Sequence, residues 1–389
     1  MDFSLAPEQE QIRDTLRGFL ADRYDFAARQ TAVRGKAGWR PDIWRAFATE
    51  LEMLGLTLPA RAGGLNGGPV ETMLVMEELG RALVVEPYLE TVVLGGHILA
   101  RAGGAAAEAT LAGIASGEAV LALAWEEPET SHEFASIASP AARAGDGWRL
   151  TGQKTAAIAA PWATHLLIAA RTGGKPGEAE GLSLFLAPAA APGIKAAPYP
   201  TIDGKRAADL TLDLVLPAAA LIGPVHGALP LLEAARDAGI AAQSAEAVGV
   251  MRRLLEDTIA YTRQRRQFGQ PIAQFQALQH RMADMYMQLE MAVSATYLAV
   301  LKQNGPALER AMACATAKVT VARAARFIGQ NAVQLHGGMG MTDALPVSHY
   351  FKRATAIEME FGSADYHLAR YARLAAGGLA VESHPRARP

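Results

Sequence analysis

The hydrophobic pattern of this chain changes twice along its 389 residues, and this limits the possible folds more than any other feature. Beyond Gly227, apolar residues recur every three or four positions over long stretches, as in Val248, Met251, Leu255 and Ile259. Such stripes are typical of helices that bury one face in a bundle. The pattern therefore predicts a helical bundle for the C-terminal part of the chain.

The middle of the chain, from Ala119 to about Pro224, has a different pattern. Short apolar runs such as 120–123 and 182–186 are separated by turn sequences rich in Gly, Asp and Pro. Runs that recur about every 8 to 12 residues predict a small antiparallel barrel or sandwich. Before Ala119 the apolar residues again have helical spacing, and a glycine-rich loop from Pro59 to Pro69 separates two of the predicted helices. We therefore predict a helical domain (1–118), a β domain (119–226), a helical bundle (227–380) and a disordered tail (381–389).

Composition excludes several classes of protein. The net charge of −2 offers no basic surface for nucleic acid. Acids near the N-terminus argue against a secretory signal, and prolines interrupt the longest uncharged stretch, 214–232, so no membrane helix is expected. The single Cys314 excludes an internal disulfide and fits a cytoplasmic protein. The nine histidines show no ligand-like spacing, so no metal site is expected.

Two segments of the predicted bundle mix arginines, amides and glycines within helical patterns. The first is RQRRQFGQPIAQFQALQHRMADM (Arg263 to Met285), and the second is QLHGGMGMTD (Gln334 to Asp343). A guanidinium group can donate two parallel hydrogen bonds to a phosphate, and glycine has no side chain, so the main chain can approach a ligand closely. The arginines near Arg265 could instead form a solvated helix end without a ligand. The sequence Phe-Gly-Gln-Pro that follows them, at 268–271, and the second segment favour a dinucleotide site.

These two segments resemble the signature regions of the acyl-CoA dehydrogenase family, and the resemblance extends over nearly the whole chain. It implies an N-terminal α-helical domain, a middle antiparallel β-barrel domain and a C-terminal four-helix bundle. It also implies FAD as the cofactor and an acyl-CoA thioester as the substrate. In this family each FAD crosses a subunit boundary: one subunit supports the flavin ring, and its neighbour holds the pyrophosphate and adenine.

The resemblance assigns the residues of the adenine end. Arg265 would pair with the pyrophosphate, Phe268 would pack near the cofactor, and Gln267 takes a position where the family often has a hydroxyl residue. Gln276 would lie near the adenosine. Gln334, Gly337 and Gly338 would approach the adenine and the pyrophosphate, with glycines at the end of a helix leaving N–H groups for an anion. His336, within that turn, is expected to be a packed or hydrogen-bonded histidine.

The carboxylate base that removes the α-proton has no evident position in this sequence. Relatives supply a Glu in a Tyr-Glu-Gly-Thr-like segment, and a match without gaps from Phe351 places Gly362 at the base and Ala364 at the hydroxyl. Other relatives carry the Glu early in the first long bundle helix, where this chain has Gly239, followed by Ile240 in place of a supporting arginine. The catalytic residue is therefore unknown. Carboxylates that lie near these two positions are Asp237, Glu246, Glu358 and Glu360.

The flavin end is also altered. The family's Thr-Glu-Pro motif reads Glu126-Glu127-Pro128 here, so a carboxylate replaces the hydroxyl that contacts the flavin. A carboxylate at this place is electrostatically unfavourable for a flavin or a pyrophosphate. The family's Trp-Ile-Thr segment reads Ala156-Ala157-Ile158, which removes the aromatic wall and the hydroxyl.

This contrast predicts the smaller, non-catalytic-type subunit of a heteromeric bacterial acyl-CoA dehydrogenase, which completes the FAD site of a paralogous subunit. Such enzymes act on pimeloyl-, steroid- or other unusual acyl-CoAs, and the sequence does not specify the acyl group. The family also implies electron-transfer flavoprotein as a partner. The alternatives are a self-sufficient homotetramer with a relocated base such as Glu360, a recruited nucleic-acid-binding flavoprotein, and a scaffold without FAD. A cofactor shared across a boundary requires a homo- or hetero-oligomer in any case.

Overall fold

A computed structural model describes residues 4–382, and the chain forms two compact units. The first unit, which we call the bundle unit, joins Met1–Phe26, Met73–Val84 and Ile240–Pro389. The second, which we call the sheet unit, joins Ala27–Thr72 and Val85–Gly239. Of the predicted disordered tail, residues 381 and 382 belong to the last helix and 383–389 lie outside the described residues.

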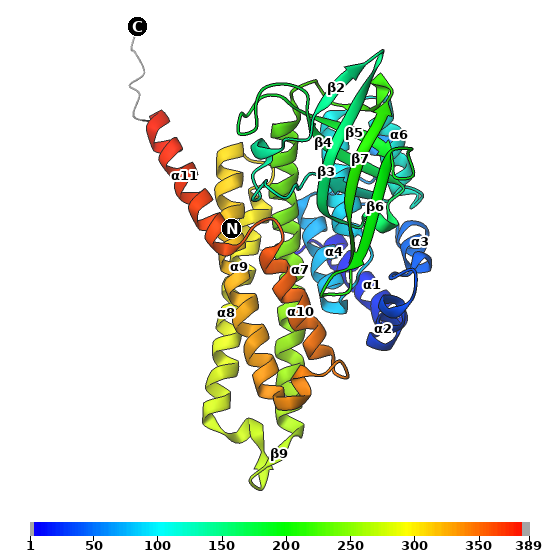
Figure 1. Ribbon diagram of the computed structural model, residues 1–389. Coiled ribbons are helices and arrows are strands. Elements are labelled where there is room, and N and C mark those ends of the chain that lie inside the picture. The colour runs from blue at the N-terminus through cyan, green and yellow to red at the C-terminus, as the bar shows by residue number, and fades with distance from the viewer. Residues whose placement is uncertain (1–3, 383–389) are drawn as a thin grey trace. The chain divides into compact units, whose positions relative to one another are not determined.

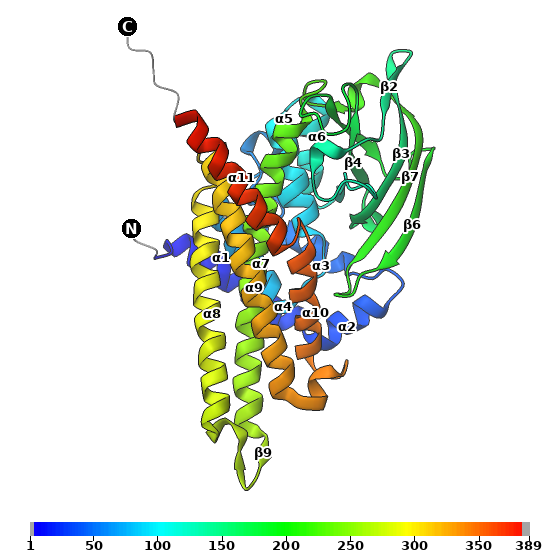
Figure 2. The same ribbon diagram turned by 60° about the vertical axis from the view of Figure 1, so that its left-hand side comes forward.

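The bundle unit is built around one central helix, α9, against which α8, α10 and α11 all pack. Figures 1 and 2 show α7, α8 and α9 running side by side, with α10 along the same group. The predicted four-helix bundle is therefore present, and α11 adds a fifth helix to it. Its helices are α1 (Pro7–Arg23), α4 (Pro69–Ala82), most of α7 (Ala228–Gln264), α8 (Gln276–Leu301), α9 (Ala307–His336), α10 (Pro346–Met359) and α11 (Ala364–Glu382).

The apolar stripes of the sequence form the core of this unit. Val248, Met251 and Leu255 of α7 are buried together with Leu289 of α8, and Ile259 packs against this cluster. Burial of such side chains stabilises the fold by about 1.5–3 kcal/mol each. The 3.6-residue period therefore predicted the inward faces of these helices.

Helices α4 and α7 approach each other closely because each has a glycine at the contact. A Cβ on Gly80 would overlap the carbonyl oxygen of Glu246, and a Cβ on Gly249 would overlap that of Glu77. Ion pairs flank the contact on its outer side: Arg252 lies 2.8 Å from Glu77, and Arg81 lies 2.9 Å from Glu256. The two glycines set the distance between these helices.

The sheet unit contains two four-stranded sheets (Figure 1). One has the strand order β1-β4-β5-β8 and the other β2-β3-β7-β6. The strands are β1 (Leu121–Ala124), β2 (Ala141–Ala144), β3 (Gly147–Ile158), β4 (His165–Arg171), β5 (Leu182–Pro188), β6 (Ile194–Pro200), β7 (Arg206–Leu216) and β8 (Leu221–Ile222). The unit's helices are α2 (Phe26–Arg34), α3 (Pro41–Thr49), α5 (His97–Ala102), α6 (Ala105–Ala115) and a π-helix, η2 (Leu89–Gly96).

The predicted antiparallel barrel differs from this arrangement in two respects. The sheets stay separate and do not close into a barrel, and β1 pairs with β4 in parallel. Parallel pairing needs a long crossover, and here strands β2 and β3 of the other sheet lie between β1 and β4 in the sequence. The two sheets share one apolar core, in which Trp148 of β3 contacts Phe185 of β5 with ring centroids 5.5 Å apart.

We expect Gly80→Ala and Gly249→Ala to destabilise the protein, because each added methyl group would force the backbones of α4 and α7 apart. Overpacking of this kind costs about 1–3 kcal/mol. Thermal unfolding of the purified variants measures the effect. Gly18→Ala in α1 is the matched control, since its Cβ would meet open space and alanine favours a helix. Equal melting temperatures for all three variants would refute the close-contact role.

Candidate functional site

The first signature segment forms the end of α7, a hairpin and the start of α8. Strands β9 (Arg266–Gln267) and β10 (Gln270–Pro271) pair across a two-residue turn. Both turn residues, Phe268 and Gly269, have positive φ, as a type I′ turn requires. Phe268 has 90% of its surface exposed, so a bulky ring stands in solvent in a conformation that costs about 1–2 kcal/mol. Such strain at an exposed position is typical of a binding site.

The second signature segment lies next to the base of this hairpin. The ring of Tyr261, in the last turn of α7, stacks on His336 at the end of α9, with centroids 4.3 Å apart. The Tyr261 hydroxyl also donates a hydrogen bond to the His336 carbonyl oxygen (3.3 Å). His336 is buried and its Nδ1 lies 2.8 Å from the Ala332 carbonyl oxygen, so it is a packed histidine, as expected. The second segment thus meets the helix end directly before the first segment, although about fifty residues separate the two segments in the sequence.

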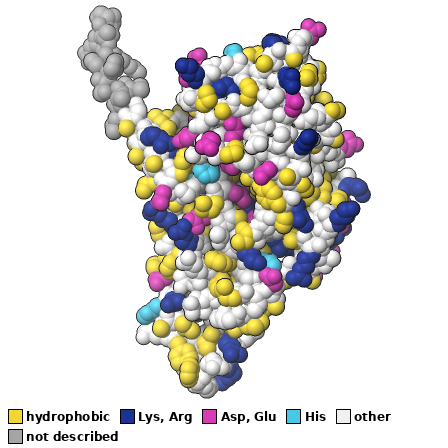
Figure 3. Space-filling model, in the orientation of Figure 1, with side chains coloured by type: hydrophobic (Ala, Val, Ile, Leu, Met, Phe, Trp, Pro, Cys, Tyr) yellow, Lys and Arg dark blue, Asp and Glu magenta, His cyan; other side chains and the backbone are white. Residues whose placement is uncertain are grey.

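The predicted adenine-end residues are exposed in this region. They are Arg265, Gln267, Phe268, Gln276, Gln334, Gly337 and Gly338. The guanidinium of Arg265 has no ion-pair partner within 4–382, and Cβ atoms on Gly337 and Gly338 would meet open space. One expectation is corrected: the Gly337 N–H donates to the Gln334 carbonyl oxygen, so it is not available to an anion. Figure 3 shows hydrophobic and basic side chains together at the end of the unit where Figure 1 places β9.

These features fit the adenine and pyrophosphate end of FAD. An unpaired guanidinium supplies charge for phosphate, an exposed ring supplies stacking surface, and the two glycines leave room for a ligand beside the main chain. This arrangement forms only half of a cofactor site. We call these seven residues the adenine half-site.

The turn after α10 carries no catalytic carboxylate. Phe361 and Gly362 both have positive φ, and a Cβ on Gly362 would overlap the ring of Tyr366. This position therefore needs glycine, so Gly362 corresponds better to the Gly of the family's Tyr-Glu-Gly-Thr segment than to its Glu. This one-residue shift corrects the match made from sequence and places Phe361 at the base and Ser363 at the hydroxyl. With either match the base is absent.

The nearby carboxylates of this unit are held in a buried network. Glu246 of α7 accepts two hydrogen bonds from Arg353 of α10 (2.6 and 2.7 Å), and both side chains are nearly inaccessible. Glu360 accepts one hydrogen bond from Arg353 (2.7 Å) and one from the side-chain amide of Gln243. A carboxylate whose oxygens are held by a guanidinium is not free to take a proton from a substrate. Glu358 pairs with Arg326 in the same way.

Lys318 of α9 completes this network. Its ammonium donates to the Gln243 side-chain oxygen (3.2 Å) and to the Ile357 carbonyl oxygen in the last turn of α10. Burial lowers the pKa of Lys318 to about 7, although the negative charge of Glu360 acts in the opposite direction and raises it. The network of Gln243, Glu246, Lys318, Arg353 and Glu360 thus joins α7, α9 and the end of α10.

In the sheet unit, Glu127 of the Glu126-Glu127-Pro128 motif forms a buried ion pair with Lys154. Glu127 lies 2.5 Å from the buried ammonium of Lys154 on β3 and accepts hydrogen bonds from the N–H groups of Ala138 and Ser139. Burial would raise the pKa of Glu127, but Lys154 and these donors lower it below the usual value. Burial also lowers the pKa of Lys154 to about 8. This pair anchors the loop after β1 to β3.

The surface of β3 that corresponds to the flavin support is occupied by the chain's own acids. A bulge follows Lys154, and the N–H of Ala156 in that bulge donates to Asp209 (3.0 Å). The Tyr199 hydroxyl donates to the same carboxylate oxygen (3.1 Å). Burial and the charges of Asp209 and Glu126 raise the pKa of Tyr199. The main-chain donor of the bulge is therefore already used, and the carboxylates of Asp209 and Glu126 lie close enough to Tyr199 to raise its pKa.

The second possible position of a base, early in α7, contains Asp237, Gly239 and Ile240. Ile240 is fully buried and Asp237 is 1% exposed. A buried isoleucine replaces the supporting arginine, which agrees with the loss of this position.

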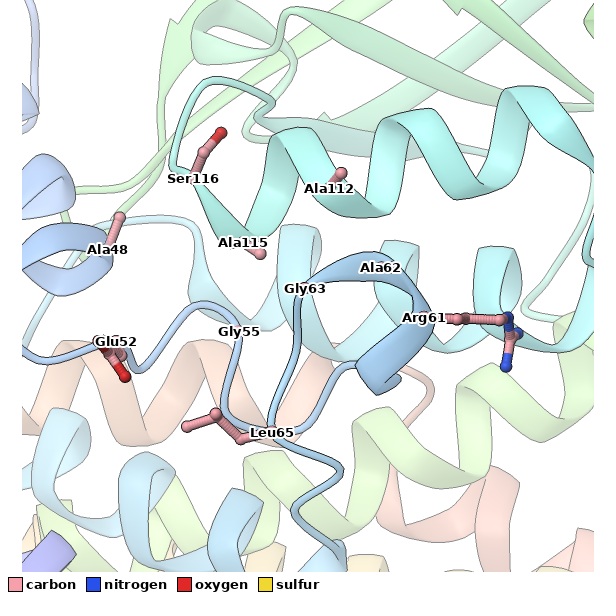
Figure 4. Close-up of a pocket in the computed structure, with 10 residues that line it drawn as sticks. All are labelled: Ala48, Glu52, Gly55, Arg61, Ala62, Gly63, Leu65, Ala112, Ala115 and Ser116. Atoms are coloured by element: carbon pink, nitrogen blue, oxygen red, sulfur yellow. The ribbon is translucent and has the colours of Figure 1, made fainter.

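The glycine-rich loop from Pro59 to Pro69 borders a pocket of about 560 Å³ (Figure 4). Small side chains such as Ala62 and Ala112 line most of it. Arg61 lies 3.5 Å from Glu108 and donates to the Ala100 carbonyl oxygen. A Cβ on Gly64 would overlap Leu58, so this glycine serves close packing of the turn. The loop is therefore a structural turn.

Sequence models of three domains match most of this chain. The acyl-CoA dehydrogenase N-terminal domain matches residues 6–118, the middle domain 122–216 and the C-terminal domain 237–375. The chain belongs to the acyl-CoA dehydrogenase family. FAD is the cofactor of this family, whose enzymes are oxidoreductases that act on a CH–CH bond of acyl-CoA.

Several known members of the acyl-CoA dehydrogenase family are similar over almost the full length. A probable acyl-CoA dehydrogenase of Bacillus subtilis, YngJ, is 29% identical, with 94% of this chain and 97% of that protein covered. A variant of the Tcur3481-Tcur3483 steroid ACAD superposes with a TM-score of 0.87 at 29% identity, covering 96% and 99%. The ChsE4-ChsE5 complex of Mycobacterium tuberculosis gives 0.87 at 26% identity, covering 99% and 100%.

Among residues 4–382, no helix is long and apolar enough to cross a membrane. Within the same residues, no group of three or more His, Cys, Asp or Glu side chains could hold a metal ion.

We expect Arg353→Met to destabilise the bundle unit strongly, because it leaves Glu246 buried without its partner. Breaking a buried ion pair from one side costs about 3–5 kcal/mol. Chemical denaturation of the purified protein measures the loss. Arg149→Met is the matched control, since Arg149 pairs with Asp213 at the surface and should cost well under about 1 kcal/mol. Similar losses in both variants would contradict the structural role of Arg353.

The depressed pKa of Lys318 predicts a dependence of stability on pH. Below about 7 the folded protein carries a buried charge, and between about 7 and 10.5 the unfolded chain binds the proton that the folded chain releases. The free energy of unfolding should therefore rise with pH in this window, by up to about 1.4 kcal/mol per unit from this residue. Lys318→Met should show a flatter slope. An unchanged slope from pH 7 to 9 would show that Lys318 keeps an ordinary pKa.

Proposed function

We propose that this chain is the non-catalytic-type subunit of a heteromeric acyl-CoA dehydrogenase and completes the FAD site of a paralogous catalytic subunit. One observation carries the proposal: the adenine half-site is exposed with Arg265 unpaired among the described residues, whereas at the expected flavin support Asp209 already binds the main-chain N–H of Ala156. The two ends of one cofactor site have therefore diverged in opposite directions. An active homomer would need both ends in the same chain.

At the adenine half-site, each residue has a role that its chemistry supports. Arg265 would pair with the pyrophosphate, and Gln276 and Gln334 would hydrogen-bond the adenosine end. Phe268 and Gln267 would contact the cofactor from the hairpin, and Gly337 and Gly338 leave room for it. The bound FAD supplies the hydride acceptor, and this chain's residues position it. The base and the surface that orients the ring would come from the partner.

The relatives support a heteromeric arrangement. The ChsE4-ChsE5 complex and the Tcur3481-Tcur3483 steroid ACAD are both assemblies of two differently named chains. By analogy, the proposal includes an acyl-CoA substrate, electron-transfer flavoprotein as electron acceptor and a cytoplasmic location. It also keeps the division into domains 1–118, 119–226 and 227–380. The acyl group stays open.

The alternative of a self-sufficient homotetramer requires a relocated base, and Glu360 was the first candidate. Its pairing with Arg353 and Gln243 argues against this role, because proton removal from a substrate would have to compete with these bonds. A recruited nucleic-acid-binding flavoprotein is disfavoured by the net charge of −2. A scaffold without FAD is disfavoured by the unpaired guanidinium of Arg265.

We expect the chain expressed alone to contain much less than one FAD per chain, and its complex with a paralogous acyl-CoA dehydrogenase from the same organism to contain bound FAD. In that complex, Arg265→Gln should lower the affinity for FAD about tenfold or more, because a charge-assisted phosphate contact contributes about 1.5–3 kcal/mol. Absorbance of the bound flavin after gel filtration measures both quantities. Arg323→Gln, at an exposed position of α9, is the matched control.

Two outcomes would contradict the proposal in different ways. One FAD per chain, bleached by an acyl-CoA in the protein expressed alone, would show a self-sufficient enzyme. Flavin content that Arg265→Gln leaves unchanged in the complex would show that this chain does not hold the adenine end.

A further inference from the structure

A second concave surface lies in the sheet unit and has no part in the proposed function. It is a pocket of about 760 Å³, within the range of small-molecule sites. The loop between α2 and α3, the 3₁₀ turn η4 (Ala160–Trp162) and the junction of β6 with β7 line it. Its lining residues are Lys36, Ala37, Trp39, Pro161, Trp162, Pro198, Tyr199, Pro200 and Arg206.

Flat, rigid groups form the walls of this pocket. The indole rings of Trp39 and Trp162 stack with centroids 5.6 Å apart and an interplanar angle of 18°. Tyr199 and three prolines add apolar surface, and the Tyr199 hydroxyl is held by Asp209. Walls of this kind suit a planar ring, which stacks on aromatic faces at low entropic cost.

The charges of the pocket are all positive. Lys36 and Arg206 are its charged lining residues, and no carboxylate is among them, although acids outnumber bases in the whole chain. Lys36 is exposed and has no ion-pair partner in the part of the chain that the structure describes. Arg206 makes only long hydrogen bonds, 3.3 and 3.5 Å, to the carbonyl oxygens of Val33 and Gly35. These two cations favour an anionic group beside Lys36 and Arg206, and the carboxylate of Asp209, which contacts Tyr199, is already bound by the Tyr199 hydroxyl and the Ala156 N–H.

The pocket is also held in shape by its own contacts. The Trp162 indole donates a hydrogen bond to the Ala37 carbonyl oxygen (2.8 Å), which ties the loop to η4. Gly38 has a φ of +77°, and a Cβ there would overlap the guanidinium group of Arg206. This glycine lets the Arg206 side chain pass the loop and reach the pocket. The cation and the ring stack are therefore positioned before any ligand binds.

We propose that this pocket binds a mononucleotide unit, meaning a flat heteroaromatic ring that carries a phosphate. The ring would lie against the indole and tyrosine faces, and the phosphate would pair with Lys36 and Arg206. The site belongs to the sheet unit, so it is distinct from the adenine half-site of the bundle unit, and it does not depend on the proposed function.

Titration of the full-length protein with ADP and with flavin mononucleotide tests the proposal, with tryptophan fluorescence as the readout. An Arg265→Gln background keeps the adenine half-site from contributing. We expect saturable binding of at least one probe with a dissociation constant on the order of 1 mM or lower. Adenosine and riboflavin, which lack the phosphate, should bind more weakly than their phosphorylated forms. The stronger probe shows whether the ring is an adenine or a flavin.

Variants separate a built site from nonspecific stacking. Trp39→Ala should weaken binding about tenfold, since stacking on an aromatic ring contributes about 1–3 kcal/mol. Lys36→Gln should weaken it about threefold to fivefold, and its position at the surface leaves folding intact. Lys195→Gln, an exposed lysine of β6 outside the pocket, is the matched control and should have no effect.

Three results would overturn the proposal. They are the absence of saturable binding at millimolar concentrations, binding that neither Trp39→Ala nor Lys36→Gln weakens, and binding to the otherwise unsubstituted protein that disappears with Arg265→Gln. The last result would assign the nucleotide to the adenine half-site, so it would support the proposed function while refuting the second site.

Discussion

The buried pair of Glu246 and Arg353 is the interaction on which the bundle unit depends. It joins α7 to α10 in the core, and through Glu360, Gln243 and Lys318 it extends to α9. Buried charges are costly unless every partner is satisfied, so this network allows little displacement of the three helices. Glu360 of this network lies two residues before Gly362, the position that the sequence match gave to the family's base.

The same arrangement of helices explains why the adenine half-site persists. Because α7 and α9 are held side by side, their ends meet, and Tyr261 stacks on His336. The hairpin with Phe268 and the glycines after α9 are then presented together at the surface. Nothing in this half-site requires a base, which agrees with the proposal that a partner subunit supplies the flavin end.

In the sheet unit, residues of the family's flavin motifs make structural contacts within the chain. The Glu127–Lys154 pair, which matches the family, is retained because it anchors a loop to β3. The adjacent bulge at Ala156 is retained as well, but its N–H group is bound by Asp209. Family motifs in this region therefore report on structure, and their presence alone does not indicate a bound flavin. The aromatic and basic pocket beside Tyr199 lies on the same sheet and carries the proposed nucleotide site.

The sequence by itself determined the inward faces of the long helices, because a 3.6-residue period follows directly from helix geometry, as Val248, Met251 and Leu255 show. It also determined the family, and it predicted that the base is absent, because the match to the family's motif puts Gly362 at that position. Sheet pairing was not predictable: β1 pairs in parallel with β4 across a long connection, and hydrophobic runs do not encode their partners. Only the tertiary structure decided that Glu360 is bound by Gln243 and that Asp209 accepts a hydrogen bond from Ala156 in the bulge. These contacts join residues far apart in the sequence or on different strands, and their geometry exists only after the chain has folded.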